Sequence, residues 1–338
     1  MLVRSCCLRR CARRRASQYF DRIRVDRMDG ALSNRLIWEQ DGLDWPHREA
    51  SHFVQAGGLR WHVQQFGGQT ADLPVAVLIH GTGASTHSWR GLAPLLAPHF
   101  SVMTMDLPGH GFTSMPAGGA GATQLSLPGM ALAINDLLQT LAIKPALVIG
   151  HSAGAAVAVR MCLDDVISPS LVISLNGAFL PLGGLAGQVF SPVAKLMAAT
   201  PLVPRLFSWS ASDPAVLRRL IDGTGSMLDA TGLALYGKLI RNPGHAAGAL
   251  GMMANWDLHT LLCELPSLDA AIGLVVGAND RTISPRQARR VMGLLGPAAR
   301  GTLTTLPGLG HLAHEEKPDV VATLICHQFL AIRALNPA

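Results

Sequence analysis

The chain has 338 residues, of which 49% are hydrophobic and only 15% are charged. This composition excludes a disordered or fibrous protein and leaves enough apolar material for a large buried core. The net charge of +6 would suit binding to nucleic acid, but residues 1–35 alone carry +7, from ten arginines against three aspartates. The other 303 residues carry −1, so the expected folded part is nearly neutral and no nucleic-acid partner is expected.

The Arg-rich start is predicted to be a disordered leader, residues 1–45, that lies outside the fold. It lacks the apolar stretch of a secretory signal, so an organelle transit peptide, a basic arm and an upstream translation start stay open. The six cysteines show neither zinc-site spacing nor the density of a disulfide scaffold, which favours a cytoplasmic protein. Peripheral contact with a membrane stays open, although no uninterrupted apolar run reaches about 18 residues.

Short apolar runs that end in glycine-rich turns predict the buried strands of a sheet. The predicted strands are 59–66, 75–79, 101–105, 146–149, 171–175, 272–276 and 302–306. The predicted helices are 127–141, 153–163, 285–295 and 318–333. Because strands alternate with helices, we expect an α/β fold with a mostly parallel central sheet and helices on both faces.

This alternation stops at about residues 181–260, where Leu, Ala, Met, Pro and Gly dominate and no strand pattern occurs. We expect a helical cap here, inserted between a first core part at 46–180 and a second at 261–338. The apolar composition suggests that the cap covers a large apolar ligand, although the same residues could equally form the cap's own core.

Residues 150–154 read G-H-S-A-G and fit the pattern G-x-S-x-G at a predicted strand-to-helix turn. Such a turn exposes the serine oxygen above the sheet, and its glycines keep side chains away from crowded backbone. Ser152 is therefore the predicted nucleophile, with a plain packing turn as the alternative. The backbone N–H groups of Ala153 and of Thr82, in the turn H-G-T-G at 80–83, are the predicted oxyanion-hole donors.

The acid and the base are expected to follow the serine in that order along the chain. Asp280 and His311 each come just after a predicted strand, so both should lie at the edge of the sheet where Ser152 lies. Asp280 is predicted to fix the tautomer of His311, which would take the serine proton. His314 is the rival base, and Asp106 is expected to shape the turn after its own strand.

The sequence carries no motif of a metal or nucleotide site. The other histidines form no H-E-x-x-H pair, no G-x-G-x-x-G follows the first strand, and no Walker loop is present. We therefore expect neither a metal nor a cofactor.

The H-G-T-G turn at 80–83, the G-x-S-x-G turn at 150–154, Asp280 and His311 follow one another along the chain. In this order they resemble the α/β-hydrolase superfamily over roughly residues 50–335. Serine at position 152 differs from the dehalogenase and epoxide-hydrolase branches, which have aspartate there. Further segments resemble the magnesium-chelatase accessory hydrolases of bacteriochlorophyll biosynthesis; they are residues 45–51, 58–63, 80–90 and 174–179. That family begins near residue 45, so residues 1–35 have no counterpart in it.

The resemblance implies a photosynthetic bacterium and a role near the insertion of magnesium into protoporphyrin, but it supplies no chemical substrate. The leading interpretation is a serine hydrolase that acts on an ester or related acyl bond of an apolar small molecule, such as a tetrapyrrole. Two alternatives stay open. One is a non-catalytic accessory protein that binds a porphyrin or a magnesium-chelatase subunit, and the other is a generic carboxylesterase.

Overall fold

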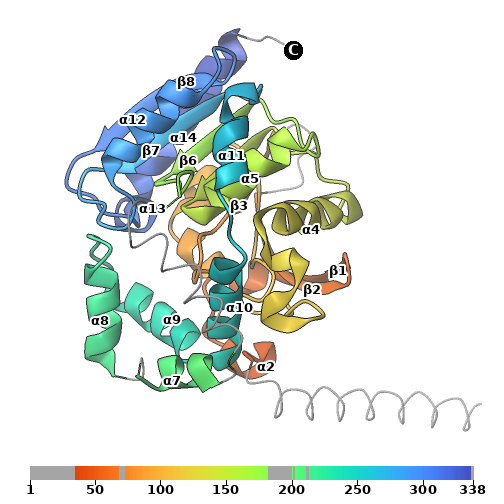
Figure 1. The fold of residues 1–338 in the computed structure, drawn as a ribbon, viewed down its shortest axis with the longest axis vertical. Coiled ribbons are helices and arrows are strands. Elements are labelled where there is room, and N and C mark those ends of the chain that lie inside the picture. The colour runs from red at the N-terminus through yellow and green to blue at the C-terminus, as the bar shows by residue number, and fades with distance from the viewer. Residues whose placement is uncertain (1–34, 68–72, 182–199, 201, 211–212, 336–338) are drawn as a thin grey trace, which may run out of the picture.

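The centre of the fold is an eight-stranded sheet, seen in a computed structural model that describes residues 35–67, 73–181, 200, 202–210 and 213–335 (Figure 1). The strands are β1 (Ser51–Ala56), β2 (Leu59–Phe66), β3 (Val75–Ile79), β4 (Ser101–Met105), β5 (Leu147–His151), β6 (Leu171–Leu175), β7 (Ile272–Gly277) and β8 (Arg300–Leu306). Their order in the sheet is β1-β2-β4-β3-β5-β6-β7-β8. β1 and β2 are antiparallel to their neighbours and the rest are parallel, which confirms the predicted fold class.

Helices cover both faces of the sheet and bury its central strands completely. The core helices are α3 (Leu92–Leu96), α4 (Leu127–Thr140), α5 (Ala153–Leu163), α12 (Pro285–Leu294), α13 (Ala313–Glu316) and α14 (Pro318–Leu335). Neighbouring residues of a strand point to opposite faces, so Val148 packs with the cluster of α4 and α5 while Ile149 packs with that of α3 and α14. Two buried faces explain why these strands are continuous apolar runs in the sequence.

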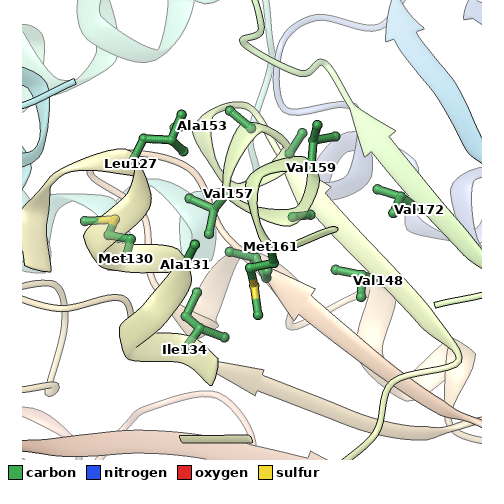
Figure 2. Packing of buried hydrophobic residues seen from close by; sticks show 14 of the residues in the cluster. Leu127, Met130, Ala131, Ile134, Val148, Ala153, Val157, Val159, Met161 and Val172 are labelled. Atoms are coloured by element: carbon green, nitrogen blue, oxygen red, sulfur yellow. The ribbon is translucent and has the colours of Figure 1, made fainter. Parts of the chain in front are cut away.

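Helix α5 holds the turn at its N-terminus in place because it packs closely on both the sheet and α4. Its small residues allow the backbones to approach, and Figure 2 shows Val157 and Met161 of α5 beside Met130 and Ile134 of α4. All four side chains are fully buried. The first residue of α5 is therefore fixed relative to the strands on which it packs.

The cap consists of helices between β6 and β7. They are α7 (Leu202–Ser210), α8 (Pro214–Asp222), α9 (Ala230–Ile240) and α10 (Pro243–Ala254), followed by α11 (His259–Glu264), which packs against α5 of the core. Side chains of Asp213, Asp229 and Asn242 accept a backbone N–H in the first turns of α8, α9 and α10, so each of these helices begins at a capping residue. Helices α7 to α10 lie together beyond one end of the sheet (Figure 1). Residues 182–199 of the predicted cap lie outside the described residues.

The chain packs on the fold from residue 35 onward, although segment 1–45 was expected to lie outside it. Trp38, in the short helix α2 (Trp38–Asp41), and Trp45 both make edge-to-face contacts with Phe112, with ring centroids 4.9 Å apart. Trp45 is only 2% exposed and donates a hydrogen bond to Thr86 Oγ1 at 3.1 Å. The rest of the predicted leader, residues 1–34, lies outside the described residues.

Helix α14 is long and apolar enough to cross a membrane by length and composition. Its residues Val321, Ile325 and Phe329 are buried with the apolar cluster on one face of the sheet. This packing is that of a helix which covers a sheet, so the composition of α14 carries little weight as a sign of a membrane span.

Candidate active site

Ser152 lies in the turn between β5 and α5 with a backbone φ of 52° and ψ of −117°. A positive φ is strained for a residue with a side chain, so the surroundings must hold it in place. The Ser152 N–H donates to the Leu175 carbonyl at 3.0 Å, and its carbonyl accepts from Ala155 at 3.2 Å and Ala178 at 3.0 Å. The turn is thus fixed by the next strand and by the loop that follows it.

The glycines around this turn are required by close packing. A Cβ at Gly154 would lie 2.1 Å from the carbonyl oxygen of Ile79, and one at Gly150 would lie 2.4 Å from the backbone of α5. A Cβ at Gly81 would lie 3.0 Å from the Cβ of Ser152. The glycine-rich turn after β3 therefore lies directly against the serine turn.

Replacing Gly154 by Ala is expected to lower the free energy of unfolding by about 3 kcal/mol, because the added methyl group has no room beside β3. Urea denaturation would measure this loss. Gly293→Ala is the matched control, since Gly293 is an exposed helical position where a Cβ meets nothing within 4 Å. That change should be neutral or slightly stabilising. An unchanged urea midpoint for Gly154→Ala would contradict the packing argument.

Asp280 and His311, the predicted acid and base, are hydrogen-bonded to each other. His311 Nδ1 donates to Asp280 Oδ2 at 2.8 Å, and Asn176 Nδ2 donates to the same oxygen at 2.7 Å. The backbone N–H groups of Thr282 and Ile283 donate to Oδ1, both at 2.8 Å. Four donors surround this carboxyl group, which matches an ionised carboxylate that only accepts hydrogen bonds.

Ser152, His311, Thr82 and Ala153 line one cavity of about 1310 Å³. Asp280 is 6% exposed and is bonded to His311 at this wall. Within the described part of the chain, the Ser152 hydroxyl and the N–H groups of Thr82 and Ala153 make no hydrogen bond. The structure therefore places the predicted residues at one cavity, and among the described residues Ser152 and His311 are not directly bonded and the hydroxyl and both N–H groups have no partner.

The cavity wall is mostly apolar away from Ser152. Its larger apolar residues are Leu180, Leu220, Ile221, Ile240, Leu250, Met253, Trp256 and Leu258. Among the described lining residues there is no Lys or Arg, and Asp257, at an exposed position, is the one carboxylate. His245 is already occupied, since its Nδ1 accepts from Gly111 at 3.0 Å and its Nε2 donates to the Gly83 carbonyl at 3.1 Å. Such a wall suits a large, apolar, uncharged group.

The rival base His314 is fully buried and does not line the cavity. Its ring lies between Trp89, at 4.7 Å, and His151, at 4.5 Å, and neither nitrogen has a partner among the described residues. Burial lowers the pKa of His314 to about 3. Of the two candidate bases, His311 and His314, it is therefore His311 that lines the cavity together with Ser152.

Asp106 holds the loops behind the site together. It accepts from His62 Nδ1 at 2.8 Å and from the backbone N–H groups of Thr86 at 2.7 Å and Phe112 at 2.8 Å. Burial disfavours the charge, but His62 and these hydrogen bonds hold the pKa of Asp106 well below its usual value. This is the turn-shaping role that its position predicts.

In the described ranges, no group of three or more His, Cys, Asp or Glu could hold a metal ion.

Asn176 is a residue of the site that sequence analysis did not identify. It follows β6 with a φ of 51° and shares Asp280 Oδ2 with His311. The available signal was the pair Asn176-Gly177 just past a predicted strand, at the same edge of the sheet as the other site residues. A Ser-acid-His triad takes a carboxylate as its acid, so an amide at this position does not by itself indicate a role in the site.

Comparison with known proteins agrees with this architecture. Residues 76–324 match the alpha/beta hydrolase family. Over 282 residues the chain is 36% identical to the magnesium-chelatase 30 kDa subunit of Rhodobacter capsulatus, which covers 83% of this chain and 95% of that protein. Among solved structures, an epoxide hydrolase superposes with a TM-score of 0.68 at 22% identity, covering 84% of this chain and 99% of that one. The enol-lactonase of Burkholderia xenovorans LB400 gives 0.65 at 22% identity, covering 83% and 100%, so both share the fold.

Proposed function

Because the chain belongs to the alpha/beta hydrolase family, we propose that it is a serine hydrolase in which Ser152 attacks an ester or related acyl bond. One observation carries this proposal. Ser152, strained in its turn and free of hydrogen bonds to described side chains, shares a cavity wall with His311, whose Nδ1 is bonded to Asp280 at 2.8 Å.

The proposed reaction follows from the tautomer of His311. Asp280 accepts a hydrogen bond from the Nδ1–H group of His311, so Nε2 carries the lone pair and can take the proton of the Ser152 hydroxyl as Oγ bonds to the acyl carbon. The carbonyl oxygen becomes an oxyanion, which the N–H groups of Thr82 and Ala153 would stabilise. His311 then protonates the leaving alcohol, and an acyl group remains on Ser152. Water, deprotonated by Nε2, releases the acid and restores the serine.

The cavity supports a bulky substrate. Its volume of about 1310 Å³ exceeds the roughly 300–1,000 Å³ of common small-molecule sites. The relative from Rhodobacter capsulatus is named as a magnesium-chelatase subunit, and we propose on this basis that the substrate is an ester in tetrapyrrole metabolism, near the chelatase step of bacteriochlorophyll synthesis. Without a Lys or Arg among the described lining residues, an esterified or otherwise neutral part of the molecule is the part expected to enter.

The second candidate is an accessory protein that binds a tetrapyrrole or a chelatase subunit without turnover. The size and apolar wall of the cavity favour it as well, because they would serve binding alone. The two candidates differ in what they require of Ser152, since only hydrolysis needs its hydroxyl.

Complementation of a deletion strain tests the proposal. The wild-type gene should restore pigment synthesis, whereas Ser152→Ala should leave an esterified precursor to accumulate, identified by chromatography and mass spectrometry. Ser267→Ala is the control, because the Ser267 side chain is exposed and, among the described residues, bonds only to the Glu264 carbonyl. Full restoration by Ser152→Ala would remove hydrolysis from the biological role and leave the accessory function.

A further inference from the structure

The loop that carries His311 is bound by a segment of the cap. The His311 N–H donates to the Thr224 carbonyl at 3.3 Å, and the Leu312 N–H donates to Ser226 Oγ at 2.8 Å. Both acceptors lie in residues 224–227, here called the clamp segment, which connects α8 to α9 and lies next to α13 (Figure 1). Ser226 is only 1% exposed, so water does not replace its hydroxyl without a change in packing.

The clamp segment also contacts the loop of the acid. The same Thr224 carbonyl accepts the N–H of Arg281 at 3.1 Å. Gly225, with a φ of +81°, lies so close that a Cβ there would be 2.0 Å from the Asn279 carbonyl oxygen. A Cβ at Gly310 would in turn lie 2.3 Å from the backbone of Gly225. The clamp segment therefore packs closely against both of the loops that carry Asp280 and His311.

The carboxylate of Glu316, in the core helix α13, bonds both the loop of His311 and the clamp segment. Glu316 Oε1 accepts the N–H of Gly310 at 2.8 Å, and Oε2 accepts the N–H of Met227 at 3.2 Å. Three successive N–H groups, those of residues 310–312, are thus held by the clamp segment or by the side chain bonded to it. Buried N–H groups that lose such acceptors are costly, so the loop would rearrange if the segment moved away.

We propose that the clamp segment positions His311 for proton transfer, with Ser226 and Glu316 as positioning residues. This rests on the proposed serine hydrolase function. A displacement of about 1 Å in a reacting group can lower a rate about 100-fold, so a loop held only by the core would transfer protons poorly. It follows that the cap does not open as a free lid at this point, and that substrate enters without displacing residues 224–227.

The test is Ser226→Ala assayed with p-nitrophenyl hexanoate. We expect kcat to fall roughly 10- to 100-fold with KM within about threefold, because the cavity wall near the acyl group is kept and only the base is misplaced. Ser226→Thr, which keeps the hydroxyl, should recover most of the lost kcat. Ser267→Ala is the control at an exposed site and should behave like the wild type. Circular dichroism checks that each variant is folded.

A second readout does not depend on turnover. The His311 Nδ1 proton, bonded to Asp280, should give a far-downfield proton NMR resonance, assigned by its loss in His311→Gln. Ser226→Ala should shift or broaden this resonance. Glu316→Gln, at a half-buried site, should do the same to a smaller extent and carries the test where Ser226→Ala does not fold. Wild-type kcat together with a wild-type resonance in the folded variants would overturn the proposal. A wild-type protein without esterase activity would instead overturn the hydrolase function, while the resonance would still report on the clamp.

Discussion

Replacing Asp280 by Asn is expected to lower kcat for ester hydrolysis about 10⁴-fold while leaving the fold intact. The reason is the set of donors around this side chain. Thr282 and Ile283 both donate backbone N–H groups to Oδ1, so the carbonyl oxygen of the new amide must face them. The amide nitrogen then replaces Oδ2, the oxygen that now accepts from His311 and Asn176.

The new amide N–H group would then face the N–H groups of His311 and Asn176, so that hydrogen-bond donors would face one another. His311 would avoid the clash by moving its proton from Nδ1 to Nε2, and Nε2 is the nitrogen that must accept the serine proton. The base is lost although the ring keeps its place. Asp136→Asn removes the same charge from an exposed position on α4 and is the matched control. Steady-state kinetics with both variants measures the effect, and an Asp280→Asn enzyme with more than about a tenth of wild-type kcat would refute the assigned role.

Lowering the pH from 7 to 4 is expected to unfold the protein. Burial lowers the pKa of a set of fully buried histidines below the ordinary value of 6.5, to about 4 for His245 and about 3 for His314. The pKa values of His87, His110 and His151 are also lowered, again chiefly by burial. In the folded protein these rings therefore bind a proton less readily than in the unfolded chain, and His245 and His314 are neutral at pH 5.

The sign follows from proton binding. Below pH 6.5 the unfolded state binds more protons than the folded state. The contribution of these histidines to the free energy of unfolding is therefore fully present above pH 6.5, and it is lost as the pH falls toward the pKa values of about 4 for His245 and about 3 for His314 in the folded protein. The lowered pKa of His245 corresponds to about 3 kcal/mol of stability lost on acidification, and the other buried histidines act in the same direction against the roughly 5–15 kcal/mol stability of a typical domain. Glu315 acts in the opposite direction, because burial raises its pKa to about 8, but it is a single group against several buried histidines.

Calorimetry from pH 7 to pH 4 measures this loss as a fall in Tm. His314→Leu removes one buried proton acceptor that has no hydrogen-bond partner among the described residues, so its acid-unfolding midpoint should lie at a lower pH. His327→Leu, at an exposed position, should leave the midpoint unchanged. Equal midpoints for His314→Leu and the wild type would show that buried histidines do not limit acid stability.

The parts of the fold that follow from local sequence were predicted closely. The runs 75–79, 101–105 and 171–175 coincide with β3, β4 and β6, because strands buried on both faces must be apolar throughout. Strand β1 was not predicted. It is an edge strand in which only Ala56 is buried, so neither an apolar run nor an alternation marks it. The two tryptophans at 38 and 45 fall inside the segment expected to be a leader, because residues 36–47 contain neither an apolar run nor a helical or strand pattern that would indicate burial.

In the site, too, the residues that a local sequence pattern marks were predicted, and those that depend on tertiary packing were not. Ser152, Asp280 and His311 each follow a recognisable strand, and the edge of a parallel sheet brings such positions together. Ser226 has no such signal. Its partner Leu312 is 86 residues away, and the bond between them depends on how the cap packs on the core. A contact of this kind follows from tertiary structure alone, which is why the clamp segment looks like an ordinary turn in the sequence.

Reaction with a serine-directed fluorophosphonate, followed by mass spectrometry of the labelled peptide, tests the central claim most directly. The wild type should carry the label on Ser152, and Ser152→Ala should carry none. Ser126→Ala serves as the control, since Ser126 also lines the cavity and should not be the site of reaction. Label on Ser152 that is lost in Ser152→Ala and kept in Ser126→Ala is the predicted result. Equal labelling of the wild type and Ser152→Ala would contradict the assignment of Ser152 as the nucleophile.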